Sequence, residues 1–386
     1  MNGNWNYPTQ VKFGPGRIKE IAECCVNAHI RRPLIVTDSG LAELPMIRNI
    51  EHLCASQGLQ VAVFSDVGGN PAGHHVENGV TAALEHESDG VIAVGGGSAI
   101  DVGKAVALMM EQGISLWDLE DIGDNYTRAN ASAIKPTIAV PTTAGTGSEV
   151  GRSSVIVHEQ EQRKVIVFHP MMMPGLVIAD PELTLSLPAG LTAATGMDAL
   201  SHNLEALCAR GDHPMADGIA VEGIRLIHRS LETAVSDGRH LQARADMLIG
   251  SMMGATAFQK GLGAMHAMAH PIGAQLKAHH GLINAIVMPY VLMWNAQAID
   301  ERITRLATYI GLENPGFDGF MDWILNLRKT IEIPHTLAAL GMEHAQIDAL
   351  AAMAAVDPAG GGNPLTMTVD DYRSLFDRAL RGDLSG

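Results

Sequence analysis

Apolar and polar residues follow different periods in the two halves of this chain. In the first half, short apolar runs are separated by segments in which apolar residues recur at helical spacing. The runs lie at residues 9–13, 33–38, 59–67, 90–94, 137–140 and 175–180. Continuous apolar runs joined by helices are typical of parallel strands that are buried on both faces. This pattern predicts a parallel, doubly wound α/β sheet of the Rossmann-like kind, with residues 9–13 as an edge strand.

Two more apolar runs, residues 153–157 and 164–168, are joined by a short charged loop and predict a β-hairpin. After Pro188 the pattern changes, because Ala, Leu, Met and His dominate and apolar positions repeat at helical spacing. A chain of 386 residues is also long for a single core. We therefore predict an α/β domain over residues 1–186 and an all-helical domain over residues 187–386.

Composition excludes some classes of partner. The formal net charge is −16 and no Lys/Arg cluster is present, so we expect no nucleic-acid partner. The four cysteines show no CxxC spacing and are expected as reduced thiols of a cytoplasmic protein. We find no secretory signal and no uncharged apolar run of the roughly 18–20 residues that a membrane span needs, so no membrane partner is expected.

Two small-residue loops follow predicted strands. The first, Gly95, Gly96, Gly97 and Ser98, opens a helix whose free N–H groups and dipole would attract a pyrophosphate. Its spacing differs from the GxGxxG fingerprint, so a tight turn without a ligand is the alternative. The second loop contains the small and hydroxyl residues Thr142, Thr143, Gly145, Thr146, Gly147 and Ser148. Together the two loops predict a dinucleotide site at the carboxyl ends of the strands.

Two acidic residues belong to the same region. Asp38 ends a predicted strand, where a carboxylate can bind an adenosine ribose and repel a 2′-phosphate, which favours NAD over NADP. The alternative for Asp38 is an ordinary helix N-cap. Asp101 is either a cofactor contact or a first-turn residue that complements the helix dipole.

Histidines concentrate in the stretch from Gly261 to Gly281. His266 and His270 are four residues apart, as are Asp198 and His202 upstream, so each pair lies on one helix face. The surroundings are rich in Ala and Leu, and a buried carboxylate needs a positive partner. A carboxylate with two or three imidazoles suits a divalent transition metal, with iron(II) and zinc both acceptable.

The chain resembles the iron-containing (group III) alcohol dehydrogenase family over nearly its whole length. Five segments carry the resemblance: GGGSAIDVGKA (95–105), PTTAGTGSEV (141–150), DPELTLSLP (180–188), TGMDALSHNLEAL (195–207) and HAMAHPIGAQLKAHHGLINAIVMP (266–289). Their order along the chain matches the family as well. The resemblance implies a dinucleotide-binding α/β domain, a helical metal domain, an active site between them and a homodimer.

The resemblance also implies roles for individual residues. The metal ligands would be Asp198, His202, His266 and His280. His270 would lie near the nicotinamide and the metal, where we expect it to relay a proton. The implied dinucleotide contacts are Asp38, Gly95, Gly96, Gly97, Ser98, Asp101, Thr142, Thr143, Thr146, Ser148, Lys164 and Leu183.

Two places depart from the family pattern near the expected substrate pocket. Lys260 stands where many members carry a small or amide residue, and Gly151-Arg152-Ser153 follows TGSEV where Thr or an apolar residue is common. Arg152, Ser153 and Lys260 are therefore candidate substrate residues, with either cation able to pair with a substrate carboxylate. The alternative places both cations on the surface or against a cofactor phosphate.

The activity that this resemblance implies is reversible hydride transfer between NAD(H) and a small primary alcohol or aldehyde. An ω-hydroxy acid and its semialdehyde, such as 4-hydroxybutyrate and succinic semialdehyde, form one candidate pair. One alternative is a metal-dependent lyase of the dehydroquinate-synthase kind, which would need more Lys and Arg around a phosphorylated substrate. Another is a non-catalytic nucleotide- or metal-binding protein.

Overall fold

The computed structural model describes residues 3–5, 9–161 and 163–385 of the chain. The chain forms two compact units. One comprises Met1–Thr143 with Gly147–Ser186, and the other comprises Ala144–Thr146 with Leu187–Gly386. The second small-residue loop, residues 142–148, is thus divided, since its central residues Ala144–Thr146 belong to the second unit.

The first unit is built on a sheet whose order, within the described residues, is β1-β2-β9-β6-β5-β3-β4. The strands are β1 (Gly3–Trp5), β2 (Gln10–Phe13), β3 (Pro33–Val36), β4 (Ala62–Phe64), β5 (Gly90–Gly95), β6 (Thr137–Pro141) and β9 (Leu176–Ala179). All neighbours pair in parallel except β1, which runs antiparallel to β2. The doubly wound prediction is confirmed, but residues 9–13 do not form the edge, because β1 covers β2.

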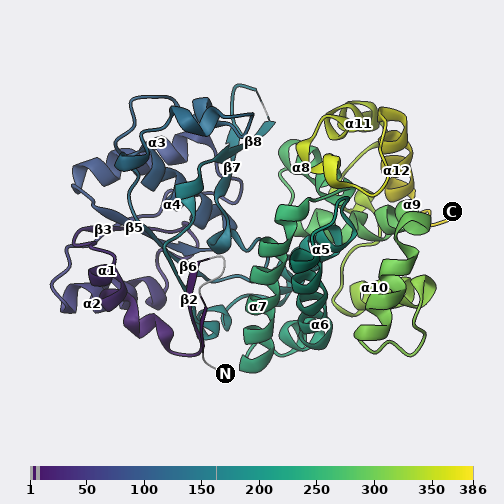
Figure 1. Cartoon of the computed structure of the whole chain (residues 1–386), viewed down its shortest axis with the longest axis horizontal. Coiled ribbons are helices and arrows are strands. Elements are labelled where there is room, and N and C mark those ends of the chain that lie inside the picture. Colours follow the sequence, from purple (N-terminus) through teal and green to yellow (C-terminus); the bar gives the residue numbers. More distant parts are fainter. Residues whose placement is uncertain (1–2, 6–8, 162, 386) are drawn as a thin grey trace. The chain divides into compact units, whose positions relative to one another are not determined.

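Helices cover both faces of this sheet (Figure 1). They are α1 (Ile21–Asn27), α2 (Pro45–Ser56), α3 (Gly73–Glu85) and α4 (Gly97–Met109). Side chains of a strand alternate between the faces, so Leu34 and Val36 pack with the core under α3 and α4. Ile35 points the other way, into the core under α1 and α2.

The predicted hairpin is also present in this unit. It consists of β7 (Ser153–His158) and β8 (Arg163–Phe168), which pair antiparallel and form a sheet of their own. Ile156, Val165 and Val167 are buried against the same core as α4. The hairpin is therefore a cover over the α4 side of the sheet and not an extension of it.

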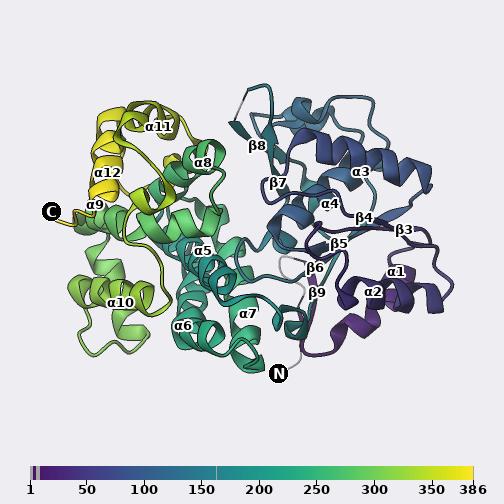
Figure 2. The same cartoon turned by 180° about the vertical axis from the view of Figure 1, so that it is seen from behind.

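The second unit is helical (Figure 2). Its helices are α5 (Ala189–Cys208), α6 (Pro214–Ser236), α7 (Leu241–Ala257), α8 (Ala264–Leu276), α9 (His280–Tyr309), α10 (Phe317–Thr330), α11 (Ile347–Ala355) and α12 (Val369–Arg381). The central helix is α5, which is buried from Thr192 to Cys208 and packs against α6, α7 and α9. This helix is buried on every side, which is the position of a central helix in a bundle.

One helix, α9, is long and apolar enough to cross a membrane by length and composition alone. Two thirds of its most apolar window is buried inside the protein. Its side chains, among them Ile283, Ile286 and Leu292, belong to the core of the helical unit. The packing therefore accounts for the hydrophobicity of this helix.

Candidate metal centre and cofactor loops

Three helices bring the predicted metal ligands together. Asp198 and His202 lie on α5 and His266 lies on α8, and one potential ligand atom of each is within 4.8 Å of the other two. All three side chains are buried. His280, the first residue of α9, places its Nε2 atom 3.8 Å from Asp198 Oδ1. Four residues from three separate helices thus share one small volume.

A glycine permits this close approach. Gly281 starts α9 directly against α5, and a Cβ atom there would lie 2.9 Å from Asp198 Cβ and would clash with the Ala194 carbonyl. Any side chain at this position would therefore push α9 away from α5. The glycine lets His280 reach the carboxylate of Asp198.

The Nδ1 atoms of two imidazoles point away from the centre of the cluster. His266 Nδ1 lies 2.6 Å from Glu205 Oε2, and His202 Nδ1 lies 3.3 Å from the Gly145 carbonyl oxygen. Both partners are acceptors, so each ring carries its proton on Nδ1. The Nε2 lone pairs are then directed at the centre. Glu205 is itself held in place, because its Oε1 accepts a hydrogen bond from the Met265 backbone N–H at 2.7 Å.

Burial sets the charge of these rings. Burial lowers the pKa of His202 to about 4, so its imidazole is neutral at physiological pH. Burial also opposes protonation of His266, but the carboxylates of Glu205 and Asp198 outweigh it and raise the pKa of this ring. A cation at this site would therefore compete with a proton at His266, and we expect its affinity to fall with acidification.

The donor set fits a divalent transition metal. It combines one buried carboxylate oxygen with imidazole nitrogens, which is the chemistry of iron(II) and zinc sites. An acceptor behind a ligating histidine, as Glu205 is here, is the usual way to fix the orientation of such a ring. A cation would compensate the charge of the buried Asp198 carboxylate, whose burial is otherwise costly.

His270 lies beside the cluster, one turn after His266. Its ring stacks on His280 with the centroids 5.5 Å apart, and its Nδ1 lies 2.9 Å from Asp357 Oδ2. The ring and the carboxylate are each about 15% exposed, so the pair connects the buried cluster to solvent. Asp357 is also fixed, because its Oδ1 accepts a hydrogen bond from the Ala359 backbone N–H.

The first glycine-rich loop lies beside Asp38 in the α/β unit. Asp38 Oδ1 accepts hydrogen bonds from the backbone N–H groups of Gly40 and Leu41, so the turn role of this residue is present. Gly95 has φ near 148°, and a Cβ there would lie 3.3 Å from Asp38 Oδ2. Thr143 packs over Gly96 at a similar distance. Backbone, carboxylate and hydroxyl groups therefore meet at the carboxyl end of β5.

A buried network holds the start of α4. Asp101 accepts hydrogen bonds from the Ser148 hydroxyl and from the Val155 N–H, and its Oδ1 lies 3.1 Å from Lys104 Nζ. Lys104 is fully buried and also donates to the carbonyl oxygens of Ser148 and Ser153. Asp101 and Ser148 thus bond to each other and to Lys104, which favours a structural role for both.

Other predicted cofactor residues occupy varied positions. Thr142 is buried, and its backbone N–H donates to the Gly95 carbonyl, which ties the two loops together. Ser98 donates to the Gly69 carbonyl, and Leu183 packs on the core under α1 and α2. Gly97 begins α4, Lys164 lies on β8, and Thr146 belongs to the helical unit.

The three candidate substrate residues have different surroundings. The guanidinium of Arg152 is exposed and lies 5.7 Å from the centre of the Phe168 ring. Ser153 begins β7, and its carbonyl is occupied by Lys104. The Lys260 ammonium is almost fully buried and pairs with Asp217 and the Leu207 carbonyl.

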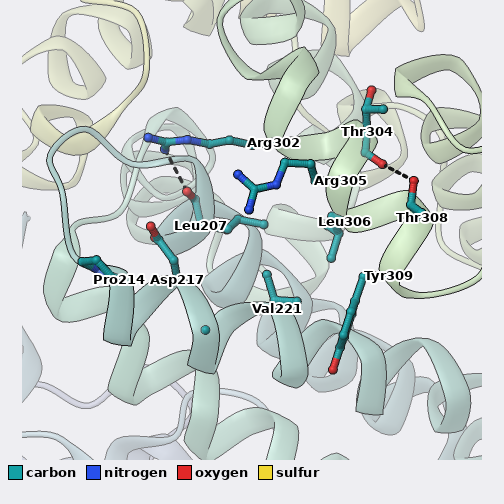
Figure 3. Close-up of a pocket in the computed structure, with 11 residues that line it drawn as sticks. Leu207, Pro214, Asp217, Val221, Arg302, Thr304, Arg305, Leu306, Thr308 and Tyr309 are labelled. Atoms are coloured by element: carbon teal, nitrogen blue, oxygen red, sulfur yellow. Dashed lines mark hydrogen bonds between the residues drawn. The ribbon is translucent and has the colours of Figure 1, made fainter.

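Figure 3 shows the pocket that Asp217 lines, between α6 and α9. It has a volume of about 750 Å³, and Arg302 donates across it to the Leu207 carbonyl at 2.9 Å. None of the predicted metal ligands lines this pocket. Because Asp217 already neutralises Lys260, this ammonium is not available to pair with a substrate carboxylate.

Sequence reasoning missed Glu205, Asn284 and Asp357. Glu205 is three residues after His202, and Asn284 is four residues after His280, so helical spacing already placed each on a ligand face. Asp357 is 87 residues from His270 and has no such local signal. Lys104 was also missed, since nothing in the pattern distinguishes a buried lysine from a surface one.

Comparisons with known proteins agree with this architecture. The model of the family described as iron-containing alcohol dehydrogenase matches residues 8–181, and that of its C-terminal domain matches residues 192–380. A 4-hydroxybutyrate dehydrogenase from Cupriavidus necator is 37% identical over 384 residues, covering 97% of this chain and 99% of that protein.

Two solved structures are similar along their whole length. A 1,3-propanediol oxidoreductase superposes with a TM-score of 0.91 at 32% identity, covering 98% of this chain and 99% of that one. A sulfoacetaldehyde reductase from Bifidobacterium kashiwanohense, solved with NAD+, gives a TM-score of 0.86 at 28% identity, with 98% of each chain covered.

A doubly wound α/β unit followed by a helical unit with a buried carboxylate–imidazole cluster defines a class of oxidoreductases that act on alcohols and aldehydes. This chain belongs to the iron-containing alcohol dehydrogenase family. The lyase and the non-catalytic alternatives have no support from these matches.

Proposed function

We propose that this chain is an NAD(H)-dependent dehydrogenase that interconverts 4-hydroxybutyrate and succinic semialdehyde. A divalent cation would be held by Asp198, His202, His266 and His280. The family favours iron(II), and the donor set also accepts zinc. The observation that carries the metal assignment is the buried convergence of Asp198, His202 and His266. The dehydrogenase of 37% identity supports the substrate, and the reductase solved with NAD+ supports the cofactor.

When bound, the cation supplies a Lewis acid that favours ionisation of an alcohol and polarises an aldehyde carbonyl. Asp198 offsets its charge, and Glu205 keeps the His266 lone pair directed at it. His270 is the proposed proton carrier. Its Nδ1–H is held by Asp357, so its Nε2 is free to accept a proton from the alcohol and pass it to solvent.

For the cofactor, the proposed contacts are the two loops named above, with Asp38 at the ribose. A carboxylate at this position binds a 2′-hydroxyl and repels a 2′-phosphate, which supports NAD over NADP. We further propose a cytoplasmic homodimer. All four cysteines are free and buried, as suits a reducing compartment, and light scattering on the purified protein would show the dimer or exclude it.

The substrate carboxylate needs a cationic partner, and Arg152 is the candidate that the structure favours. Its guanidinium is exposed and makes no ion pair with the described residues, whereas Lys260 is paired with Asp217. A guanidinium can bind a carboxylate with two parallel hydrogen bonds.

We expect Arg152→Gln to raise KM for succinic semialdehyde about 10–100-fold, because a charge-assisted hydrogen bond contributes roughly 1.5–3 kcal/mol. KM for butanal, which lacks the carboxylate, should change less than about threefold. NADH oxidation followed at 340 nm measures both. Lys260→Gln is the matched control and should affect the two aldehydes equally. A selective effect of Lys260→Gln, with none of Arg152→Gln, would reverse the assignment.

A further inference from the structure

One polar side chain of the cluster has no role among the predicted ligands. Asn284 lies on α9, four residues after His280, and is completely buried. Its Nδ2 atom lies 2.9 Å from Asp198 Oδ1, 3.2 Å from His266 Nε2 and 3.2 Å from His280 Nε2. Each of these three atoms belongs to a different predicted ligand.

The other end of the same amide is unsatisfied. Asn284 Oδ1 is buried and has no hydrogen-bond partner among the described residues. Leaving a buried acceptor unpaired costs roughly 1–3 kcal/mol, so an apolar residue of similar shape would be the cheaper choice for a packing role alone. We therefore expect the contacts of the amide nitrogen to compensate for the cost of the unpaired oxygen.

Asn295 on the same helix shows what a purely structural asparagine looks like. It is also buried, but its Nδ2 donates to the Val291 carbonyl and to Asn363 Oδ1, and its Oδ1 accepts from Asn363 Nδ2. Both ends of that amide are satisfied, and none of its partners is a predicted ligand. The two residues differ in what they hold together.

We propose that Asn284 is a positioning residue of the metal site. It keeps Asp198 Oδ1 and the Nε2 atoms of His266 and His280 in fixed positions before the cation binds. Electron-rich atoms that lie close together repel one another, and the Asn284 Nδ2 group, with its two hydrogens, lies within hydrogen-bond distance of all three atoms. The ligand atoms are thereby kept near the geometry that a cation needs, and less ordering remains to be done on binding. The inference rests on the proposed metal site.

The test compares metal affinity in Asn284→Leu and Asn295→Leu. Each full-length protein is stripped of metal and titrated with Co²⁺, and binding is followed by the visible absorption of the bound ion. Asn284→Leu should raise the Kd for Co²⁺ about 10–100-fold, the usual effect of losing a group that orients ligands. Asn295→Leu should leave the Kd within about threefold of wild type, although both variants lose a buried polar residue.

The outcomes separate the two claims. Equal Kd values in wild type and Asn284→Leu would overturn the role of Asn284 alone, while no Co²⁺ binding in the wild type would overturn the metal site with it. If Asn284→Leu fails to fold, Asn284→Ala replaces it. That variant also lacks the amide donors, so its Kd for Co²⁺ should likewise rise about 10–100-fold. A Kd equal to that of wild type would contradict the proposal.

Discussion

Three buried carboxylates, those of Asp198, Glu205 and Glu149, are compensated in different ways. Asp198 faces imidazole nitrogens and the amide of Asn284, and Glu205 accepts from His266 and a backbone N–H. Glu149 is also buried, but its Oε1 has no hydrogen-bond partner among the described residues. Burial raises the pKa of Glu149 to about 7, although a backbone hydrogen bond and the charge of Lys104 oppose this shift.

This pKa makes stability depend on pH with a definite sign. Between about pH 4.5 and 7 the folded protein keeps a proton on Glu149 that the unfolded chain has lost, so this residue lowers stability as pH rises. Glu149→Gln cannot ionise. The free energy of unfolding of Glu149→Gln, measured relative to that of wild type, should therefore rise by about 3 kcal/mol between pH 4.5 and pH 7.5.

Urea unfolding at both pH values measures this difference. Glu111→Gln, which removes an exposed partner of Lys135, is the control and should show a change below about 0.5 kcal/mol. A difference between Glu149→Gln and wild type that stays constant with pH would contradict the assignment.

At the scale of elements, α4 joins the glycine-rich loop to the hairpin. Its first turns carry Asp101 and Lys104, which bond to Ser148 after β6 and to the backbone of β7. A buried ion pair of this kind is poor evidence for net stability, but it fixes how elements are placed against each other. Here it holds Ser148, at the end of the second loop, against the start of α4.

Lys104→Met should destabilise the protein by roughly 3–5 kcal/mol, because Lys104 is fully buried and its removal leaves the largely buried carboxylate of Asp101 without a cationic partner. The free energy of unfolding in urea gives the value. Lys135→Met breaks the exposed pair with Glu111 and should cost no more than about 1 kcal/mol. Similar losses in the two variants would show that the Lys104 pair is not effectively buried.

At the scale of the whole molecule, the cluster ties together three helices that are separate in the sequence. Asp198 and His202 come from α5, His266 from α8 and His280 from α9. A cation that binds the folded chain and not the unfolded one stabilises the fold by mass action. The metal is thus expected to stabilise the helical unit as well as to take part in the reaction.

Removal of metal with a chelator should lower Tm, and return of Fe²⁺ under anaerobic conditions, or of Zn²⁺, should restore it. At a free metal concentration of about 100 times Kd, the gain is about 2.7 kcal/mol. Scanning calorimetry or dye-monitored melting records the shift. His280→Ala should lose the response, and the exposed His344→Ala should keep it. A Tm that is indifferent to metal in the wild type would count against the site.

The sequence alone determined the class of fold and pointed to the residues that we propose for the metal site. Apolar runs of strand length and helical periodicity are local patterns, so both the α/β unit and the helical unit could be predicted from them. The bounds of β3, β5 and β6 lie close to the predicted runs. Asp198 with His202, and His266 with His270, are helix-face pairs that need no tertiary information.

Tertiary structure decided everything that depends on contacts between distant segments. β1 covers the predicted edge strand, Asp217 neutralises Lys260, and Asp357 holds His270, and none of these partners is marked by sequence spacing. The physical reason is that periodicity reports which face of an element is buried and not what lies against it. The partner of a charged group is set by packing, and its pKa and chemistry follow from that partner.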